Sequence, residues 1–361
     1  MTYPLNGRMA EVLALTGAGK LDDATALIQR TLGAASGQAT PGTWPAAPVD
    51  LRAEGPSFLP APHTTSKAPG GSKPVGDPGP WPQRFRHATA RGRLDYILYV
   101  PSRVEEALPL VVMLHGCTQS AEDFARGTRM NELAEEIGFV VAYPEQAQSA
   151  NAQKCWNWFR PGDQAKDGGE PAMIAGITRE IIAAHRIDPA RVYVAGLSAG
   201  GAAAAIMADA YPDLYAAAGI HSGLACGSAR DMPSAFAAMK GQGARPARGS
   251  RAYVPVITFH GDRDNTVHPA NSEQIHAAWA SSPAMASLER KVHEGVSPGG
   301  RNYRQTALVD NKGRSFAENW EIKGAGHAWS GGSPAGSYTD STGPDASREM
   351  LRFFLQHRLA G

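Results

Sequence analysis

The segment GLSAGG at residues 196–201 places one serine, Ser198, between small residues. A serine hydroxyl is a poor nucleophile unless the backbone presents it and a neighbouring base takes its proton. Glycines two positions before and two positions after the serine permit the sharp strand-to-helix turn that exposes Oγ above a sheet. GxSxG alone is a loose pattern, but here a buried apolar run precedes it and an Ala-rich helical stretch follows. The segment therefore predicts that Ser198 is a catalytic nucleophile.

Two aspartates compete for the acid that would orient the base of such a serine. Both follow the apolar run at 254–261, in the sequence DRDNTV. Asp264 fits the spacing HGxxDxxV, which recurs as the acid loop of hydrolases with this nucleophile turn. Asp262 fits that spacing poorly, and aspartates commonly form turns. We therefore predict Asp264 as the acid.

The base is expected last in the chain, on a loop after a strand, because hydrolases with this turn order their triads Ser, Asp, His. His327 lies in GAGHAWSGG at 324–332, after the strand-like run NWEIK, and its flanking glycines allow it to reach the serine. Most of the other histidines are interpreted as ordinary surface side chains, among them His63, His87, His185 and His276.

Acyl transfer also needs two N–H donors for the oxyanion, each contributing on the order of 3 kcal/mol to transition-state stabilisation. The loop HGCTQ at 115–119 directly follows an apolar run. We assign one donor to the N–H of Cys117 and the other to the N–H of Ala199. His115 could be a turn residue only, but its place after a buried strand favours a role in the site, and we assign it to substrate binding.

The elements that must position these residues alternate between strand and helix from residue 83 onward. Strands are expected at 94–100, 109–116, 139–145, 191–196, 216–222, 254–261, 287–293, 303–309 and 319–323, and helices at 120–136, 171–185, 199–210, 272–280 and 344–358. Continuously apolar runs such as 109–116 are typical of parallel strands buried on both faces. The alternation predicts an α/β fold with a mostly parallel central sheet flanked by helices.

Composition divides the chain into three zones. Residues 1–35 are expected to form a helical segment of two short helices. Residues 36–82 hold eleven of the 27 prolines and are interpreted as a disordered linker, because such a sequence cannot bury enough apolar surface to offset its ordering entropy. Residues 83–361 are assigned to the catalytic domain. Within it, the excursion at 222–250, with Met232, Phe236 and Met239, is interpreted as a partial lid.

Charge and cysteine content exclude several classes of function. The 35 basic and 34 acidic residues leave a net charge of +1, and no basic run occurs, so we expect no nucleic-acid partner. No apolar stretch is long enough to cross a bilayer, so we expect no membrane partner. The three cysteines match no zinc spacing, and we expect neither metal nor cofactor. By spacing alone they are either three buried thiols or one disulfide plus a third cysteine.

Five segments together resemble bacterial polyhydroxybutyrate (PHB) depolymerase-like esterases, an α/β-hydrolase family that is also similar to feruloyl and acetylxylan esterases. These segments are HGCTQ (115–119), CWNWF (155–159), RVYVAGLSAGG (191–201), HGDRDNTV (260–267) and GHAWSGG (326–332). They occur in this order, and the resemblance covers roughly residues 84–358. It implies an α/β-hydrolase fold and a serine esterase that hydrolyses short-chain 3-hydroxybutyrate polymers or oligomers and small esters through an acyl-enzyme.

The same resemblance places Cys117 and Cys155 on either side of the active site. We therefore predict a disulfide between them, which would leave Cys226 outside the bridge and hold the Cys117 N–H where the oxyanion forms. Closing this loop could stabilise the fold by about 3 kcal/mol. Reduced thiols remain the alternative, because they are the default in a cytosolic protein.

Aromatic residues near the expected site suit a substrate groove, because flat apolar faces fit acyl chains or a ferulate ring. Trp156, Trp158 and Trp329 are assigned to substrate binding on this ground. They could equally belong to the core, and for Phe159 the core is the preferred interpretation.

Three alternatives remain beside this interpretation. The first is a carbohydrate esterase that removes feruloyl or acetyl groups. The second, a peptidase, is disfavoured because such a relative would usually carry a β-propeller, and no repeat is present. The third is a binding module on an inactive scaffold, which the complete triad contradicts. The N-terminal helices could contact a polymer granule, a second subunit or the catalytic domain.

Location follows from the same observations. Charged residues interrupt the first 20 positions before a signal-peptide core could form, which favours the cytoplasm. The family resemblance gives an extracellular location as the alternative.

Overall fold

The computed structural model describes residues 83–89, 92–104, 106–243, 253–280 and 285–359. The predicted helical segment 1–35 and linker 36–82 lie outside the described residues, as do residues 244–250 of the predicted lid.

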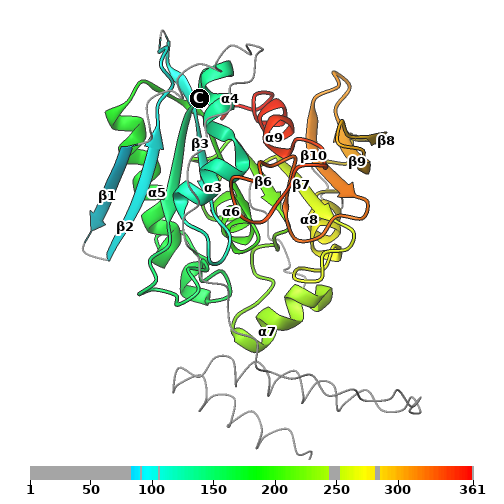
Figure 1. The fold of residues 1–361 in the computed structure, drawn as a ribbon, viewed down its shortest axis with the longest axis horizontal. Coiled ribbons are helices and arrows are strands. Elements are labelled where there is room, and N and C mark those ends of the chain that lie inside the picture. Colours follow the sequence, from blue (N-terminus) through cyan, green and yellow to red (C-terminus); the bar gives the residue numbers. More distant parts are fainter. Residues whose placement is uncertain (1–82, 90–91, 105, 244–252, 281–284, 360–361) are drawn as a thin grey trace, which may run out of the picture. The chain divides into compact units, whose positions relative to one another are not determined.

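One central sheet organises the described residues (Figure 1). In spatial order its ten strands are β1 (Gln83–Thr89), β2 (Gly92–Tyr99), β4 (Val140–Glu145), β3 (Leu108–Leu114), β5 (Ile187–Leu197), β6 (Ala217–His221), β7 (Val256–Gly261), β10 (Ser315–Ile322), β9 (Asn302–Val309) and β8 (Glu289–Val296). The inner strands from β4 to β10 run parallel, and an antiparallel pair lies at each side of them. This confirms the prediction of an α/β fold with a mostly parallel sheet.

Helices cover both faces of the sheet (Figure 1). One face carries α3 (Ala121–Thr128), α4 (Met130–Ile137) and α9 (Ala346–Phe354), and the other carries α5 (Gly169–Ala184), α6 (Ala199–Ala210) and α8 (Ala270–Ala280). Alternate residues of β3 explain the two cores, since Val112 packs with α5 and α6 while Val111 and Met113 pack with α3, α4 and α9. The short α7 (Met232–Ala237) follows β6, and 3₁₀ and π turns occupy Pro161–Asp163 and Ala238–Gln242.

The structure corrects several predicted boundaries. The single helix expected at 120–136 is two helices, because Arg129 has a left-handed φ of 58° that ends α3 and precedes α4. The closing helix is shorter than expected, and its first turn is capped by the Asp345 carboxylate, which accepts the Arg348 N–H at 3.0 Å. The edge strand β1 and a small parallel pair, β11 (Trp329–Ser330) with β12 (Thr339–Asp340), were not predicted.

Strand register brings the predicted site residues to one edge of the sheet. Leu114 at the end of β3 pairs with Gly196 of β5, and Ile322 at the end of β10 pairs with Gly261 at the end of β7. The loops after β3, β5, β7 and β10 therefore leave the sheet at the same, carboxyl edge, where α/β folds bind their ligands.

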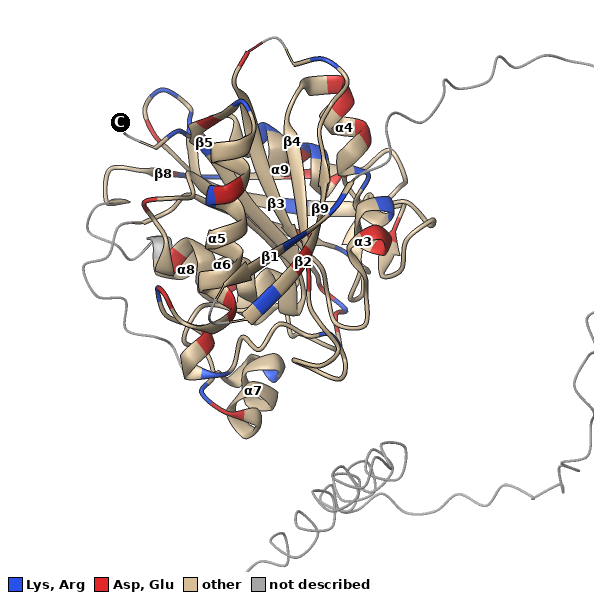
Figure 2. Ribbon diagram, turned by 90° about the vertical axis from the view of Figure 1, so that its left-hand side faces the viewer, with Lys and Arg blue, Asp and Glu red and all other residues tan. Residues whose placement is uncertain are grey.

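The distribution of charged residues agrees with the balanced composition. In the ribbon of Figure 2, basic and acidic residues are both scattered over the helices and loops. Among the described residues, no helix combines the length and apolar character that crossing a membrane requires.

Candidate active site

Ser198 stands at the turn between β5 and α6 with φ 58° and ψ −119°, a conformation that is rare for a residue with a side chain. Its backbone N–H donates to His221 O at 2.9 Å, which ties the turn to the end of β6. The two glycines have a steric reason: a Cβ at Gly196 would lie 2.3 Å from Gly200 O, and a Cβ at Gly200 would lie 2.0 Å from Leu114 O. The turn thus has the strained geometry that GxSxG predicts.

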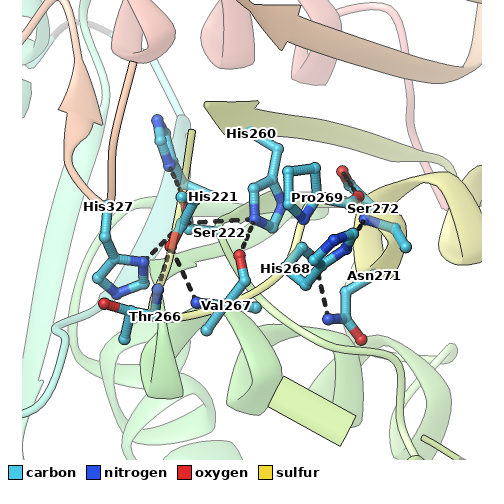
Figure 3. A network of polar contacts seen from close by, with 12 residues as sticks. His221, Ser222, His260, Thr266, Val267, His268, Pro269, Asn271, Ser272 and His327 are labelled. Atoms are coloured by element: carbon cyan, nitrogen blue, oxygen red, sulfur yellow. Dashed lines mark hydrogen bonds and ion pairs between the residues drawn. The ribbon is translucent and has the colours of Figure 1, made fainter. Parts of the chain in front are cut away.

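Asp264 and His327 come together from neighbouring parallel strands, after β7 and β10. His327 Nδ1 lies 2.7 Å from Asp264 Oδ2. The other carboxylate oxygen, Oδ1, accepts the N–H groups of Thr266 and Val267, each at 2.9 Å. Figure 3 shows the side chain of His327 close to Thr266 and Val267. Because the carboxylate accepts from His327, that imidazole carries its proton on Nδ1 and leaves Nε2 as a possible base.

The electrostatics of Asp264 favour its ionised form. Burial alone would raise the pKa of this carboxyl, but hydrogen bonds from His260 and His327 outweigh burial and hold the pKa well below its ordinary value. A carboxylate that stays charged can orient His327 and stabilise the imidazolium formed when the histidine takes a proton.

Asp262, the competing carboxylate, has a different environment. Its Oδ1 accepts the Gly324 N–H at 2.6 Å, and its Oδ2 lies 3.8 Å from Lys323 Nζ. It therefore joins the loop after β7 to the loop after β10. The role of Asp262 is thus structural, but it links two loops 62 residues apart and does not form a local turn.

Two buried histidines, which the sequence analysis did not single out, support the triad residues. His221 accepts the Ser330 N–H on Nε2 at 3.0 Å, and its ring stacks between Phe259 and Trp329. Burial lowers the pKa of His221 well below its ordinary value, so the ring is neutral. The backbone of His221 is thus hydrogen-bonded to the Ser198 turn, while its ring is hydrogen-bonded to the loop that contains His327.

His260 is the second of these histidines (Figure 3). Its Nε2 lies 2.7 Å from Val267 O and 3.4 Å from Asp264 Oδ2. Both neighbours are acceptors, so Nε2 carries the proton and donates to them. Both His221 and His260 lie at the end of an apolar strand, and this position is the sequence signal that could have revealed them.

The predicted oxyanion donors lie on the adjacent ends of β3 and β5. Neither Cys117 N nor Ala199 N donates a hydrogen bond to another described residue. The loop of Cys117 is fixed by Gln119, whose Oε1 accepts the Gly116 N–H at 2.9 Å. A disulfide joins Cys117 to Cys155, with the two Cα atoms 4.2 Å apart, and Cys226 lies outside it.

The structure corrects the four residues assigned to substrate binding. His115, Trp156, Trp158 and Trp329 are all buried. Trp156 Nε1 donates to His115 O at 3.1 Å, and Trp329 Nε1 donates to Ser347 Oγ at 3.0 Å. Buried indole N–H groups with such internal partners belong to the core.

The buried rings of His115 and Trp156 hold the loop 115–119, which carries the proposed oxyanion donor Cys117 and is called the oxyanion loop. His115 Nε2 accepts the Gln146 N–H at 3.0 Å, while Nδ1 donates to Gly116 O at 2.7 Å. Trp158 instead packs edge-on against the half-buried Phe159. His115 and Trp156 therefore shape the site without facing the substrate.

Two further features frame the site. In the predicted lid, Met232 and Phe236 on α7 are exposed, whereas Met239 packs half-buried against the core.

A cleft of about 980 Å³ opens beside β1 and β2, and its lining includes Arg160 and Glu170 but none of the predicted triad residues. Within the described residues, no group of three or more His, Cys, Asp or Glu side chains could hold a metal ion.

The geometry can be set beside known proteins. Residues 94–284, more than half of the chain, match the family described as esterase PHB depolymerase. The chain belongs to this family. A relative, poly(3-hydroxyalkanoate) depolymerase C of Paucimonas lemoignei, is 39% identical over 251 residues, which are 66% of this chain and 59% of that protein.

Two further relatives of this chain carry different names. A probable acetylxylan esterase A of Aspergillus clavatus is 30% identical over 201 residues, or 51% of this chain and 64% of that protein. Feruloyl esterase B of Thermothelomyces thermophilus is 29% identical over 222 residues, or 56% of this chain and 74% of that protein.

Structural likeness supports the fold. The acetyl xylan esterase from Aspergillus awamori superposes with a TM-score of 0.60 at 20% identity, covering 76% of this chain and 99% of that one. This shows that the described domain has the fold of an α/β esterase. The chain spans 59% of the length of the poly(3-hydroxyalkanoate) depolymerase and 64% of that of the Aspergillus clavatus acetylxylan esterase.

Proposed function

We propose that this chain is a serine esterase that hydrolyses short-chain 3-hydroxybutyrate polymers or oligomers and small esters. The observation that carries the proposal is the 2.7 Å contact between His327 Nδ1 and Asp264 Oδ2, on loops that leave the same edge of the sheet as the left-handed Ser198. Membership of the PHB depolymerase esterase family supports the ester as substrate class.

The proposed reaction begins when His327 Nε2 removes the Ser198 hydroxyl proton. Oγ then attacks the ester carbonyl carbon, and the carbonyl oxygen becomes an oxyanion bound by the N–H groups of Cys117 and Ala199. The tetrahedral intermediate collapses when His327 returns the proton to the leaving alcohol, which leaves an acyl-enzyme on Ser198. Water then gives a proton to the same imidazole and attacks the acyl carbon. As the bond from that carbon to Oγ breaks, His327 returns the proton to Ser198 and the acid is released.

A carbohydrate esterase is the second candidate. The similarity to acetylxylan esterase A and feruloyl esterase B, at 30% and 29% identity, favours it. The higher identity to a poly(3-hydroxyalkanoate) depolymerase, over a longer part of this chain, favours the first candidate.

We also propose that the chain works in an oxidising compartment, which is the extracellular alternative of the sequence analysis. The Cys117–Cys155 bridge supports this, because such bonds persist outside reducing cytosol.

A substrate panel on the purified chain tests the function. We expect turnover of p-nitrophenyl butyrate and linear 3-hydroxybutyrate oligomers to exceed turnover of methyl ferulate and acetylated xylan. The opposite order would select the carbohydrate esterase. An alkyl phosphonate should label Ser198 stoichiometrically, and the Ser198→Ala variant should lose activity and labelling together. Labelling at another residue would overturn the assignment.

A further inference from the structure

Tyr338 is an exposed aromatic residue in an unfavourable backbone conformation. Its exposed fraction is 47%, and its φ is 52°, in the left-handed region that bulky side chains avoid. An exposed ring gains little from packing, so burial does not explain this conformation. Strained residues persist where the surrounding structure imposes them, and they concentrate where proteins hold ligands.

The neighbours of Tyr338 on both sides are fixed. Ser337 N donates to Asp123 Oδ1 at 3.0 Å, and Ser337 Oγ donates to Asp123 Oδ2 at 2.5 Å. Thr339 Oγ1 donates to Ser333 O at 2.9 Å. Gly336 packs so tightly on α3 that an added Cβ would lie 2.5 Å from Asp123 O. These contacts hold the Tyr338 backbone in place without any help from its ring.

The Tyr338 hydroxyl is anchored on the oxyanion loop. It lies 3.2 Å from Thr118 Oγ1, and Thr118 Oγ1 in turn donates to Cys117 O at 2.6 Å. Because the Thr118 proton is used in that bond, Tyr338 is the donor to Thr118. Thr118 is also exposed and left-handed, with φ 67°. Two strained, exposed residues from distant segments therefore meet beside the proposed oxyanion donor.

Tyr338 is tied to the loop of the catalytic base as well. Its carbonyl oxygen accepts the Trp329 N–H at 2.7 Å, two residues after His327. The residue thus connects the loop that carries His327 with the loop that carries Cys117, and an ester carbonyl between Ser198 and the oxyanion donors would lie beside both loops.

We propose that Tyr338 contacts the bound ester and that its ring, held by the hydroxyl anchor on Thr118, favours esters with an extended apolar chain. This inference rests on the proposed esterase function. The anchored ring offers a flat apolar face that needs no further ordering on binding, and such preorganisation strengthens binding of any chain long enough to reach it. An acetyl ester is too short to benefit.

Two variants distinguish the effect of the Tyr338 ring on substrate preference from the effect of its strained backbone. Tyr338→Phe keeps the ring and removes its anchor, whereas Tyr338→Asn removes the ring and adopts the left-handed conformation readily. The readout is the kcat/KM for a linear 3-hydroxybutyrate trimer divided by that for p-nitrophenyl acetate. This ratio does not depend on how much of a preparation is folded.

For Tyr338→Asn we expect the ratio to fall about three- to tenfold, mainly through a higher KM for the trimer. Tyr338→Phe should lie between this variant and the unchanged chain. An unchanged ratio in Tyr338→Asn would overturn the inference, and so would equal losses on both substrates, because these would mean that Tyr338 acts only on the oxyanion loop. If the unchanged chain hydrolyses neither ester, the proposed function fails instead.

Discussion

The ring of His221 accepts the backbone N–H of Ser330 at 3.0 Å, while the backbone oxygen of the same residue accepts the N–H of Ser198 at 2.9 Å. One buried residue therefore supports both the turn of the proposed nucleophile and the loop of the proposed base. We expect the alignment of Ser198 with His327 to depend on this shared support, since no direct hydrogen bond joins their side chains among the described residues.

Replacing His221 with phenylalanine should weaken this support. The new ring can still stack on Trp329, but the Ser330 N–H loses its acceptor. We expect a loss of about 1–3 kcal/mol in the free energy of unfolding and a fall of about 10- to 100-fold in kcat. Urea denaturation and steady-state kinetics on p-nitrophenyl butyrate measure the two effects.

His357→Phe is the matched control, because His357 is also buried and its ring also lies against an aromatic ring, that of Phe353. This control should change stability while kcat stays within about twofold. If His221→Phe keeps full kcat, the shared support is irrelevant to catalysis.

Exchanging the two competing aspartates for asparagine separates their roles. Asp264→Asn should lower kcat by about 10³–10⁴-fold, because the amide cannot hold His327 in the required tautomer. Asp262→Asn keeps an acceptor for the Gly324 N–H and should change kcat by less than about tenfold. Initial rates on p-nitrophenyl butyrate decide the ranking, and a reversed order would identify Asp262 as the acid.

Removing the Cys117–Cys155 bridge should cost both stability and rate. The bridge links residues 38 positions apart. In the double variant Cys117→Ser, Cys155→Ser we expect a loss of about 3 kcal/mol in unfolding free energy and a lower kcat, because the Cys117 N–H is held less firmly.

The state of the cysteines can also be counted directly. Thiol titration of the denatured, unreduced chain should find one reactive group, and Cys226→Ser should abolish it. Three reactive groups would contradict the bridge and, with it, the proposal of an oxidising compartment.

Glu170 should make stability depend on pH. Its carboxylate accepts hydrogen bonds from Gln146 and Asn157, and burial raises its pKa to about 7. Between the ordinary value of 4.5 and about 7 the folded chain therefore holds a proton that the unfolded chain has lost. The stability due to this group is fully present below the lower value and is lost as the pH rises through the higher one.

Glu170→Gln removes this dependence. The unfolding free energy of the variant relative to the unchanged chain should therefore increase between pH 5 and pH 8, by about 1–3 kcal/mol since the residue is only partly buried. Urea titrations at both values measure it, with the exposed Glu273→Gln as control. A difference that stays constant with pH would show that Glu170 ionises normally.

The sequence predicted the parts of the site that local composition encodes. The GxSxG turn owes its shape to contacts of Gly196 and Gly200 within a few residues or with the adjacent strand, so it leaves a visible pattern. The loop of His327 also carries a visible glycine, Gly324, whose φ of 72° is in the left-handed region. The inner strands were also predictable, because strands buried on both faces are continuously apolar.

Other features depend on partners far away in the sequence. The support from His221 requires Ser330, 109 residues later, and the burial of Trp156 requires His115, 41 residues earlier. An aromatic residue near a catalytic motif has the same local pattern whether it faces the core or the substrate. The break at Arg129 was missed for another reason, since no glycine marks its left-handed conformation.

The absent side chain of Gly200 has a consequence for redesigning this protein. The space that a Cβ would need is occupied by the Leu114 carbonyl, part of the backbone of the strand next to the nucleophile. Saturation mutagenesis there should return glycine alone among active clones, since any other residue would force apart the two strands that hold the nucleophile and the oxyanion loop. Altered substrate range is therefore best sought by varying exposed loop residues such as Thr118, while the turn itself is left constant.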